Sequence, residues 1–152
     1  MDNHIFFMQQ AFIQAQKAYD LMEVPVGAVI VKDNNIIGTG YNKKEMLKDP
    51  VSHAEIEAIK EACINTGDWR LNDAIMYVTA EPCIMCAGAI LQARIKKVYF
   101  GVKEPKFGGI VSKDNIFDKQ DLNHKVSYEY GLLENEIIEL MKSFFLKLRQ
   151  KD

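Results

Sequence analysis

The chain has 152 residues, which suits one domain and leaves no room for a second that folds independently. Apolar residues make up 48% of it and charged residues 26%, so we expect neither a disordered nor a membrane-embedded protein. The net charge of −2 excludes a strong overall positive field that would attract a polyanion. Any contact with nucleic acid must therefore be local.

The N-terminus and the cysteines indicate the compartment. The first residues lack the basic start and cleavage site of a signal peptide, and no apolar run reaches membrane-spanning length. We therefore expect a cytoplasmic protein without membrane contact. Three cysteines cannot pair evenly, and Cys83 and Cys86 stand three positions apart. This spacing favours metal binding or redox chemistry over a disulfide framework.

The N-terminal third of the chain predicts a helix followed by a hairpin. Apolar residues recur at helical spacing from about residue 4 to residue 22, which indicates an amphipathic helix. Residues 26–31 and 36–41 have the pattern of strands, and the turn-forming residues 33–35 join them. An antiparallel pair of strands should therefore begin a sheet.

The remaining elements continue an alternation of helices and strands. A helix is predicted to begin at Ser52, whose side chain suits an N-cap, and to run towards Ile64. The segment 83–91 is apolar all round, which indicates a helix buried on most sides, against a partner subunit for example. The other predicted elements are strands at 74–80, 98–102 and 126–130 and a closing helix at 133–148.

Cys83 and Cys86 form one half of a candidate metal site. Placed in the first turn of a helix, they share a face on which the helix dipole lowers thiol pKa values. His53 is the candidate third ligand, whereas Cys63 lies ten residues beyond it, about 15 Å along the same predicted helix. Three ligands leave a fourth position for water, whose pKa falls to about 7 on an open zinc site.

Glu55 is the candidate proton carrier. It lies two residues after His53 and points away from it on an ideal helix, so it suits proton transfer better than ligation. Each half of the constellation also has a simpler interpretation. Ser52 to Glu55 fits a capping box, in which Glu55 only bonds back to the Ser52 backbone. The spacing of the two cysteines also fits a redox pair at a helix start.

The two halves together match the His-x-Glu and Pro-Cys-x-x-Cys signature of zinc deaminases. The chain resembles the bacterial tRNA-specific adenosine deaminases (TadA), which belong to the cytidine and deoxycytidylate deaminase superfamily. The resemblance extends over nearly the whole chain. The segments that carry it most clearly are Glu23–Val29, Asp49–Glu55 and Glu81–Ala89.

The resemblance implies both a fold and an activity. The fold is α/β, a three-layer α-β-α cytidine-deaminase-like arrangement whose five-stranded mixed sheet carries helices on both faces. It implies a single CMP/dCMP-type deaminase domain over residues 1–152, in a homodimer whose partner helps to shape each active site. The activity is hydrolytic deamination of the wobble adenosine, at the first anticodon position of tRNA, to inosine with release of ammonia.

The resemblance also assigns roles to the site residues. His53, Cys83 and Cys86 would hold one zinc ion per subunit. Glu55 would be catalytic, taking a proton from the zinc water and delivering it to adenine N1 before hydroxide attacks C6. Asn42 would recognise the base, although an asparagine after a strand is equally typical of a turn. The positions that touch the anticodon stem-loop in the family are Lys106, Asn123, Phe144, Phe145 and Arg149, of which Phe144 fits the core equally well.

One loop departs from the family pattern. Within residues 103–112, Phe107 and Val111 stand where relatives have glycine-tolerant positions, and these residues adopt positive backbone angles less freely than glycine. The sequence therefore does not establish which contacts this loop makes with substrate. The alternative function is a deaminase of free nucleobases or nucleosides, of the guanine or cytidine type, because those enzymes share the zinc signature. A zinc-stabilised binding module could dispense with Glu55, so its presence favours catalysis.

Overall fold

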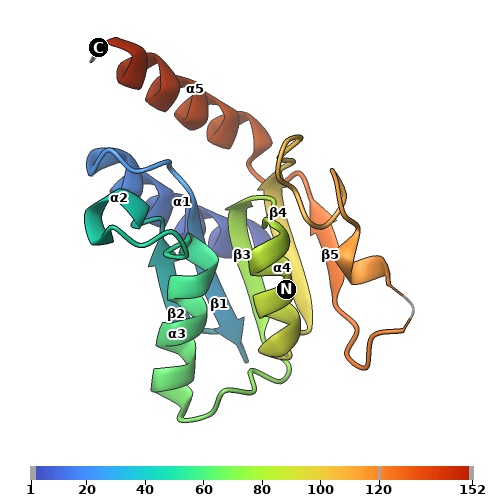
Figure 1. Ribbon diagram of the computed structural model, residues 1–152. Coiled ribbons are helices and arrows are strands. Elements are labelled where there is room, and N and C mark those ends of the chain that lie inside the picture. Colours follow the sequence, from blue (N-terminus) through green and yellow to red (C-terminus); the bar gives the residue numbers. More distant parts are fainter. Residues whose placement is uncertain (1–2, 120, 151–152) are drawn as a thin grey trace.

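The computed structural model describes residues 3–119 and 121–150. Helices and strands alternate along most of the chain (Figure 1). In order, the elements are α1 (His4–Asp20), β1 (Gly27–Lys32), β2 (Asn35–Tyr41), α2 (Lys44–Leu47), α3 (Ala54–Thr66), β3 (Ile75–Ala80), α4 (Ile84–Gln92), β4 (Lys97–Val102), the 3-10 helix η1 (Ile116–Asp118), β5 (Ser127–Tyr130) and α5 (Glu134–Gln150).

The strands form one mixed sheet in the order β2-β1-β3-β4-β5. β1 is antiparallel to both β2 and β3, whereas β3, β4 and β5 run parallel to one another. The β1–β2 hairpin turns at Asp33 and Asn34, whose φ angles of 51° and 63° suit the twist of the flanking strands. The predicted hairpin and the five-stranded mixed sheet are confirmed.

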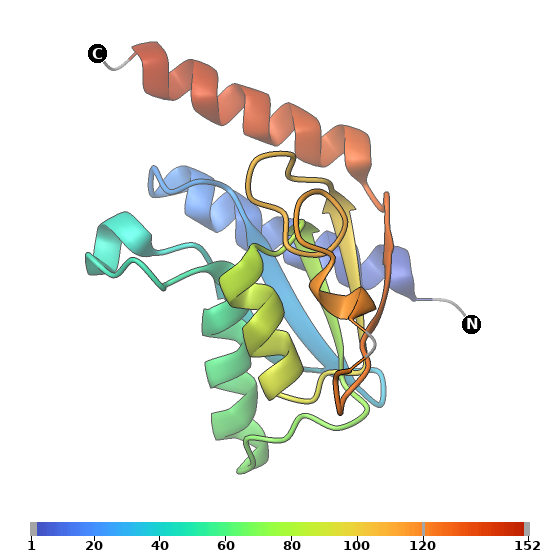
Figure 2. The same ribbon diagram turned by 45° about the vertical axis from the view of Figure 1, so that its right-hand side comes forward.

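Alternate side chains of the strands point to opposite faces, and helices cover both faces (Figures 1 and 2). On one face, Ile30 and Met76 pack with residues of α3 and α4. On the other, Val29 and Tyr77 pack with α1 and with Ile137 near the start of α5. The α-β-α layering is therefore the expected one.

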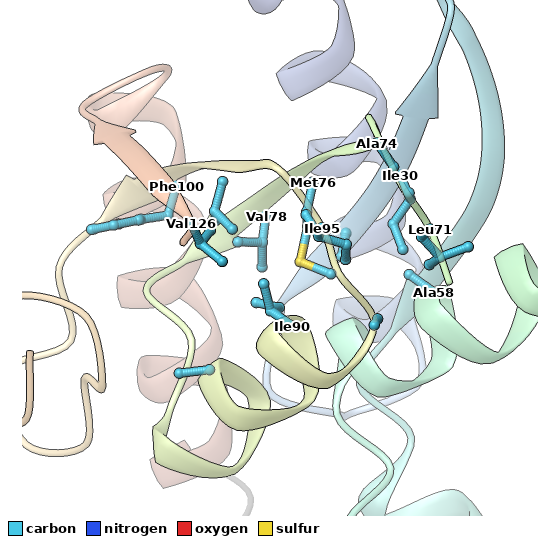
Figure 3. Packing of buried hydrophobic residues seen from close by; sticks show 14 of the residues in the cluster. Ile30, Ala58, Leu71, Ala74, Met76, Val78, Ile90, Ile95, Phe100 and Val126 are labelled. Atoms are coloured by element: carbon cyan, nitrogen blue, oxygen red, sulfur yellow. The ribbon is translucent and has the colours of Figure 1, made fainter. Parts of the chain in front are cut away.

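The larger core cluster lies between the sheet and the helices α3 and α4 (Figure 3). Met76 and Val78 of β3 lie over Ile90 of α4, and Phe100 of β4 belongs to the same cluster. Beside them, β2 approaches α3 so closely that a Cβ atom on Gly40 would lie 2.3 Å from the carbonyl oxygen of Ala54. Glycine is required there because any side chain would push α3, and the residues at its start, off the sheet.

The sheet brings the first turns of two helices to the same end of the molecule. The register of β1 against β2 and β3 places the end of β2, at Tyr41, near the end of β3, at Ala80. The chain enters α3 and α4 after these strand ends, and α5 crosses the same end of the sheet (Figure 2). Three segments remote in sequence therefore converge there.

One prediction about the helices needs correction, because the third helix begins at Ala54, not at Ser52. The burial of α4 on most sides stays a prediction, since part of the helix is exposed in the single chain. Ile84 is 57% exposed, and Met85, Gly88 and Ala89 are half-buried, so an apolar strip of α4 faces away from the sheet. Within residues 3–119 and 121–150, no helix is both long and apolar enough to span a membrane.

Candidate active site

Three metal-ligating side chains meet where α3 and α4 begin. His53 is the residue before α3, Cys83 is the residue before α4, and Cys86 lies in the first turn of α4. The Nδ1 atom of His53 lies 3.6 Å from the Cys83 sulfur and 3.5 Å from the Cys86 sulfur. One ligand atom from each of the three residues lies within 4.8 Å of the others.

These distances fit a tetrahedral zinc ion. Zinc binds sulfur at about 2.3 Å and imidazole nitrogen at about 2.0–2.1 Å, so a tetrahedral angle separates the nitrogen from each sulfur by roughly 3.6 Å. The observed separations of 3.6 and 3.5 Å agree with that value. Cys63 is not part of this group and instead directs its thiol at the carbonyl oxygen of Trp69. The donor set of one nitrogen and two sulfurs therefore suits zinc with an open position.

His53 and Glu55 face the same pocket, contrary to the ideal-helix prediction. That prediction assumed that both residues were helical, but His53 precedes the helix with extended angles of φ −81° and ψ 157°. The direction of its side chain is therefore not set by the 3.6-residue period of the helix. Ser52 does not cap the helix, because its hydroxyl donates to the carboxylate of Glu57. Glu55 is 4% exposed and turned towards the cysteines, which disfavours the capping-box interpretation.

The hydrogen bond between the two cysteines shifts their thiol pKa values in opposite directions. A hydrogen bond from the Cys86 thiol lowers the pKa of the Cys83 thiol to about 4, with a further contribution from His53 and against the effect of burial. The same hydrogen bond, together with burial, raises the pKa of Cys86, which supplies the proton. Thiolate is the form that binds metal, and Cys83 carries it at the positive end of a helix.

The pKa values of Glu55 and His53 are both raised by their surroundings. Burial raises the pKa of Glu55 to about 7, although a backbone hydrogen bond and the nearby His53 oppose the rise. The hydrogen bond to Cys83 raises the pKa of His53, against partial burial, and the Glu55 carboxylate adds to the rise. A carboxyl group that titrates near pH 7 can both accept and return a proton during a reaction cycle.

His53, Cys83 and Glu55 line a pocket of about 740 Å³. A volume of this order is typical of small-molecule sites. The pocket combines the metal-ligating end with apolar walls and a polar rim. Among the residues that line it are Val26, Asn42, Lys44, His53, Glu55, Cys83, Lys106, Phe107, Met141 and Phe145.

Comparisons with known proteins agree with this geometry. The sequence model of the MafB19-like deaminases matches residues 1–149. The tRNA-specific adenosine deaminase of Aquifex aeolicus is 49% identical over 144 residues, which are 95% of each chain. That of Streptococcus pyogenes serotype M1 is 43% identical over 151 residues, which are 99% of this chain and 88% of the relative. The chain belongs to the family of tRNA-specific adenosine deaminases.

Solved structures extend the comparison to the fold. A structure from a study of A-to-I editing by tRNA:A34 deaminases is 41% identical, has a TM-score of 0.85 and covers 89% of this chain and 98% of its own. A guanine deaminase from Bacillus subtilis is 32% identical with a TM-score of 0.67, over 98% of this chain and 95% of its own. The protein is thus an enzyme of the deaminase class with the fold that the resemblance implied.

The structure brings together most residues that the family resemblance assigned to substrate. Asn42, Lys106 and Phe145 line the same pocket as His53 and Glu55. Arg149 lines a second hollow that shares Phe145 with the first. The predicted RNA-contacting residues of this chain therefore line two hollows that share Phe145, with two exceptions.

Phe144 and Asn123 are the exceptions. Phe144 is 2% exposed, and its ring packs against Tyr19 of α1, so it belongs to the core and its predicted contact with RNA is wrong. Asn123 is exposed before β5, whose first residue pairs with Lys97 at the start of β4. It therefore lies at the opposite end of the sheet from Cys83, and its RNA contact stays a prediction.

Sequence reasoning missed two buried carboxylates beside the pocket. Glu81 is 4% exposed and accepts hydrogen bonds from the backbone of the loop that follows β4. Glu23 is 1% exposed and accepts from the backbone of Glu45 and Met46 at the start of α2. Both lie in the family segments quoted above, but a glutamate in a short motif does not reveal which distant backbone groups it binds.

The substitution Cys86→Ser is expected to abolish stoichiometric zinc binding, because a neutral hydroxyl replaces a thiolate ligand. Cys63→Ser is the matched control and should retain about one zinc per chain. Metal content of the purified variants, measured by plasma mass spectrometry alongside circular dichroism, checks both. Loss of zinc from Cys63→Ser, or its retention in Cys86→Ser, would contradict the assignment of ligands.

Proposed function

We propose that the protein hydrolyses the adenosine at the first anticodon position of tRNA to inosine and ammonia, acting as one deaminase domain over residues 1–152 with one zinc ion per subunit. The observation that carries the proposal is the convergence of His53, Cys83 and Cys86 at zinc-like distances beside the buried Glu55. Relatives 41–49% identical to the chain are named tRNA-specific adenosine deaminases, which supports the substrate. A tRNA substrate also implies action in the cytoplasm.

His53, Cys83 and Cys86 hold the zinc ion in this proposal. When bound, such an ion lowers the pKa of the water in its open position to about 7 and so makes hydroxide available at neutral pH. The three residues reach the site from the starts of two helices that the core fixes on the sheet, so their geometry is set before substrate arrives. The site therefore needs no activated serine or cysteine nucleophile.

Glu55 moves the protons. Its carboxylate accepts a proton from the attacking water and delivers it to N1 of adenine, which makes C6 electrophilic. The carboxylate then takes the proton of the new hydroxyl group on C6 and passes it to the departing amino group, so that adenosine and water give inosine and ammonia. Burial, which raises the pKa of Glu55 to about 7, favours both directions of transfer at neutral pH.

Asn42 orients the base. It follows β2, is 7% exposed and lines the pocket, and its backbone N–H donates to the carbonyl of Val26 at 3.2 Å. This bond fixes the backbone of Asn42, and the side-chain amide offers a donor and acceptors to the edge of a purine. The apolar wall at Val26 leaves room for the flat ring. Recognition of an extruded base needs both features.

The surface around the pocket suits a single-stranded loop of RNA. Phe145 is 43% exposed at the boundary between the two hollows, and it offers a stacking surface. Lys106 supplies a cation on the pocket side and Arg149 one on the other side. Anticodon bases are already largely unpaired, so extrusion costs less than from a duplex. Local cations of this kind are what a chain of net charge −2 requires.

The exposed strip of α4 suits a second copy of the chain. Ile84 is 57% exposed and lies next to the ligand Cys83, so a subunit that packs there also covers one side of the site. An isologous, antiparallel pairing of α4 with its copy would bring the far end of each α4 towards the opposite pocket. Asn123 lies at that far end, because its neighbour His124 bonds to the carbonyl of Ile95, just after α4. The homodimer would thus let each Asn123 contact RNA bound by the partner.

The substitution Ile84→Glu is expected to yield monomers, because it places a charge in the buried apolar strip of the proposed interface. Ile64→Glu is the control, since Ile64 is 79% exposed and belongs to α3 and not to α4. Analytical ultracentrifugation of both variants and the wild type checks the result. A dimer that survives Ile84→Glu would exclude α4 as its interface.

The substitution Glu55→Gln is expected to retain zinc and the fold but to lower inosine formation by about three orders of magnitude or more, because the amide cannot carry a proton. Zinc content and circular dichroism serve as the controls. The rate is followed by sequencing or chromatography of a tRNA anticodon stem-loop with adenosine at the wobble position. If Glu55→Gln formed inosine at the wild-type rate, the role of Glu55 in proton transfer would be refuted.

Ammonia release from a panel of substrates tests the substrate class. The anticodon stem-loop should be turned over, and free adenosine, guanine and cytidine should be turned over slowly or not at all, because they lack the flanking nucleotides that the rim binds. The structural likeness to a guanine deaminase makes guanine the most informative competitor. Turnover of guanine or cytidine without turnover of RNA would replace the proposal with a free-base or nucleoside deaminase.

A further inference from the structure

The carboxylate of Glu81 binds the loop after β4 at several points. Its two oxygens accept hydrogen bonds from the backbone N–H groups of Glu104 at 3.0 Å, Ile110 at 3.0 Å, Val111 at 2.8 Å and Ser112 at 3.0 Å. The Ser112 hydroxyl also donates to it. These hydrogen bonds hold the pKa of Glu81 below its usual range, although burial alone would raise it. One buried side chain thus ties together both ends of residues 104–112.

The same loop packs directly against the carboxylate and against the segment that precedes α4. A Cβ atom on Gly108 would lie 2.3 Å from the carboxyl carbon of Glu81, so only glycine fits. The N–H of Gly109 donates to the carbonyl of Pro82 at 2.8 Å, and Gly108 forms a β-bridge with Cys83. The loop is therefore held in register with the chain segment that carries a zinc-ligand candidate.

The tip of the loop forms part of the pocket rim. Pro105, Lys106 and Phe107 line the pocket beside Asn42 and Glu55. The Phe107 ring is 67% exposed to solvent. Contact with another apolar surface would lower the free energy of such a ring. Neither Phe107 nor Val111 adopts a positive φ angle, so the departure from the family pattern causes no backbone strain here.

We propose that Glu81 is a positioning residue for substrate: it holds residues 104–112 so that the Phe107 ring stacks on a nucleobase next to the one that is deaminated. Aromatic rings at a single-stranded nucleic-acid site stack on bases with little sequence preference. A ring on an untethered loop would lose part of this benefit to the entropy of ordering the loop. The inference rests on the proposed function, because a free nucleobase has no neighbour for Phe107 to contact.

The requirement is for a carboxylate rather than for any polar side chain. All the groups that face Glu81 are donors, and a carboxylate only accepts. An amide in its place would have an NH2 group where one carboxylate oxygen stands. This donor would face backbone N–H donors, and the hydrogen bonds on that side would be lost. Glu81→Gln therefore loosens the loop while it keeps the volume of the side chain.

A double-mutant cycle on the zinc-loaded, full-length enzyme tests the inference. Phe107→Ala and Glu81→Gln should each raise KM for the anticodon stem-loop about tenfold, with kcat changed less than about threefold. The double variant should be little worse than either single variant, because Glu81 acts through Phe107. Gly108→Ala places a Cβ atom against the Glu81 carboxylate, which keeps its charge, and so disturbs the same contact with the loop. It should raise KM similarly, which keeps the test available if Glu81→Gln folds poorly.

Glu23→Gln is the matched control, because Glu23 is an equally buried carboxylate that binds a different segment. In the double variant of Glu23→Gln and Phe107→Ala, the fold-changes in KM should multiply, because the two residues act independently. The role of Glu81 would be overturned if the KM increases of Glu81→Gln and Phe107→Ala multiplied in the double variant. It would also be overturned if Glu81→Gln lowered kcat without changing KM. Wild-type enzyme that does not turn over the stem-loop would overturn the proposed function and this inference together.

Discussion

The site depends on one constraint, which is that the starts of α3 and α4 meet at the same end of the sheet. Glycines in β2 let α3 lie directly on the sheet, and Ile90 fixes α4 beside it. His53 and Cys83 stand just outside these helices, where the backbone is extended and side chains can turn towards each other. A shift of either helix by an ångström would break the donor distances that suit zinc.

Two buried glutamates at this junction have opposite pKa shifts, because hydrogen bonds outweigh burial at only one of them. Glu55 is buried without a full set of donors, and its pKa rises to about 7, which suits proton transfer. Glu81 is equally buried but surrounded by backbone N–H groups, and its pKa is held low, which suits a fixed structural charge. The same residue type thus serves chemistry at one position and, in our proposal, loop positioning at another.

The sequence predicted the parts of the structure that depend on local pattern. Periodicity located the main helices and strands, and the match to the zinc-deaminase signature indicated the ligand group His53, Cys83 and Cys86 that the structure brings together. Orientation was not predictable in the same way. Whether His53 belongs to α3, and whether Phe144 or Phe145 faces the core, depends on helix starts and tertiary packing. The bonds of Glu81 join residues more than twenty positions apart, which no local pattern encodes.

The most direct test of the central claim is zinc K-edge X-ray absorption on the purified protein, together with its zinc content. The account predicts about one zinc per chain, with two sulfur ligands at about 2.3 Å and the remaining nitrogen and oxygen ligands at about 2.0–2.1 Å. A spectrum with no sulfur ligands or with four, or a protein that binds no stoichiometric metal, would contradict it.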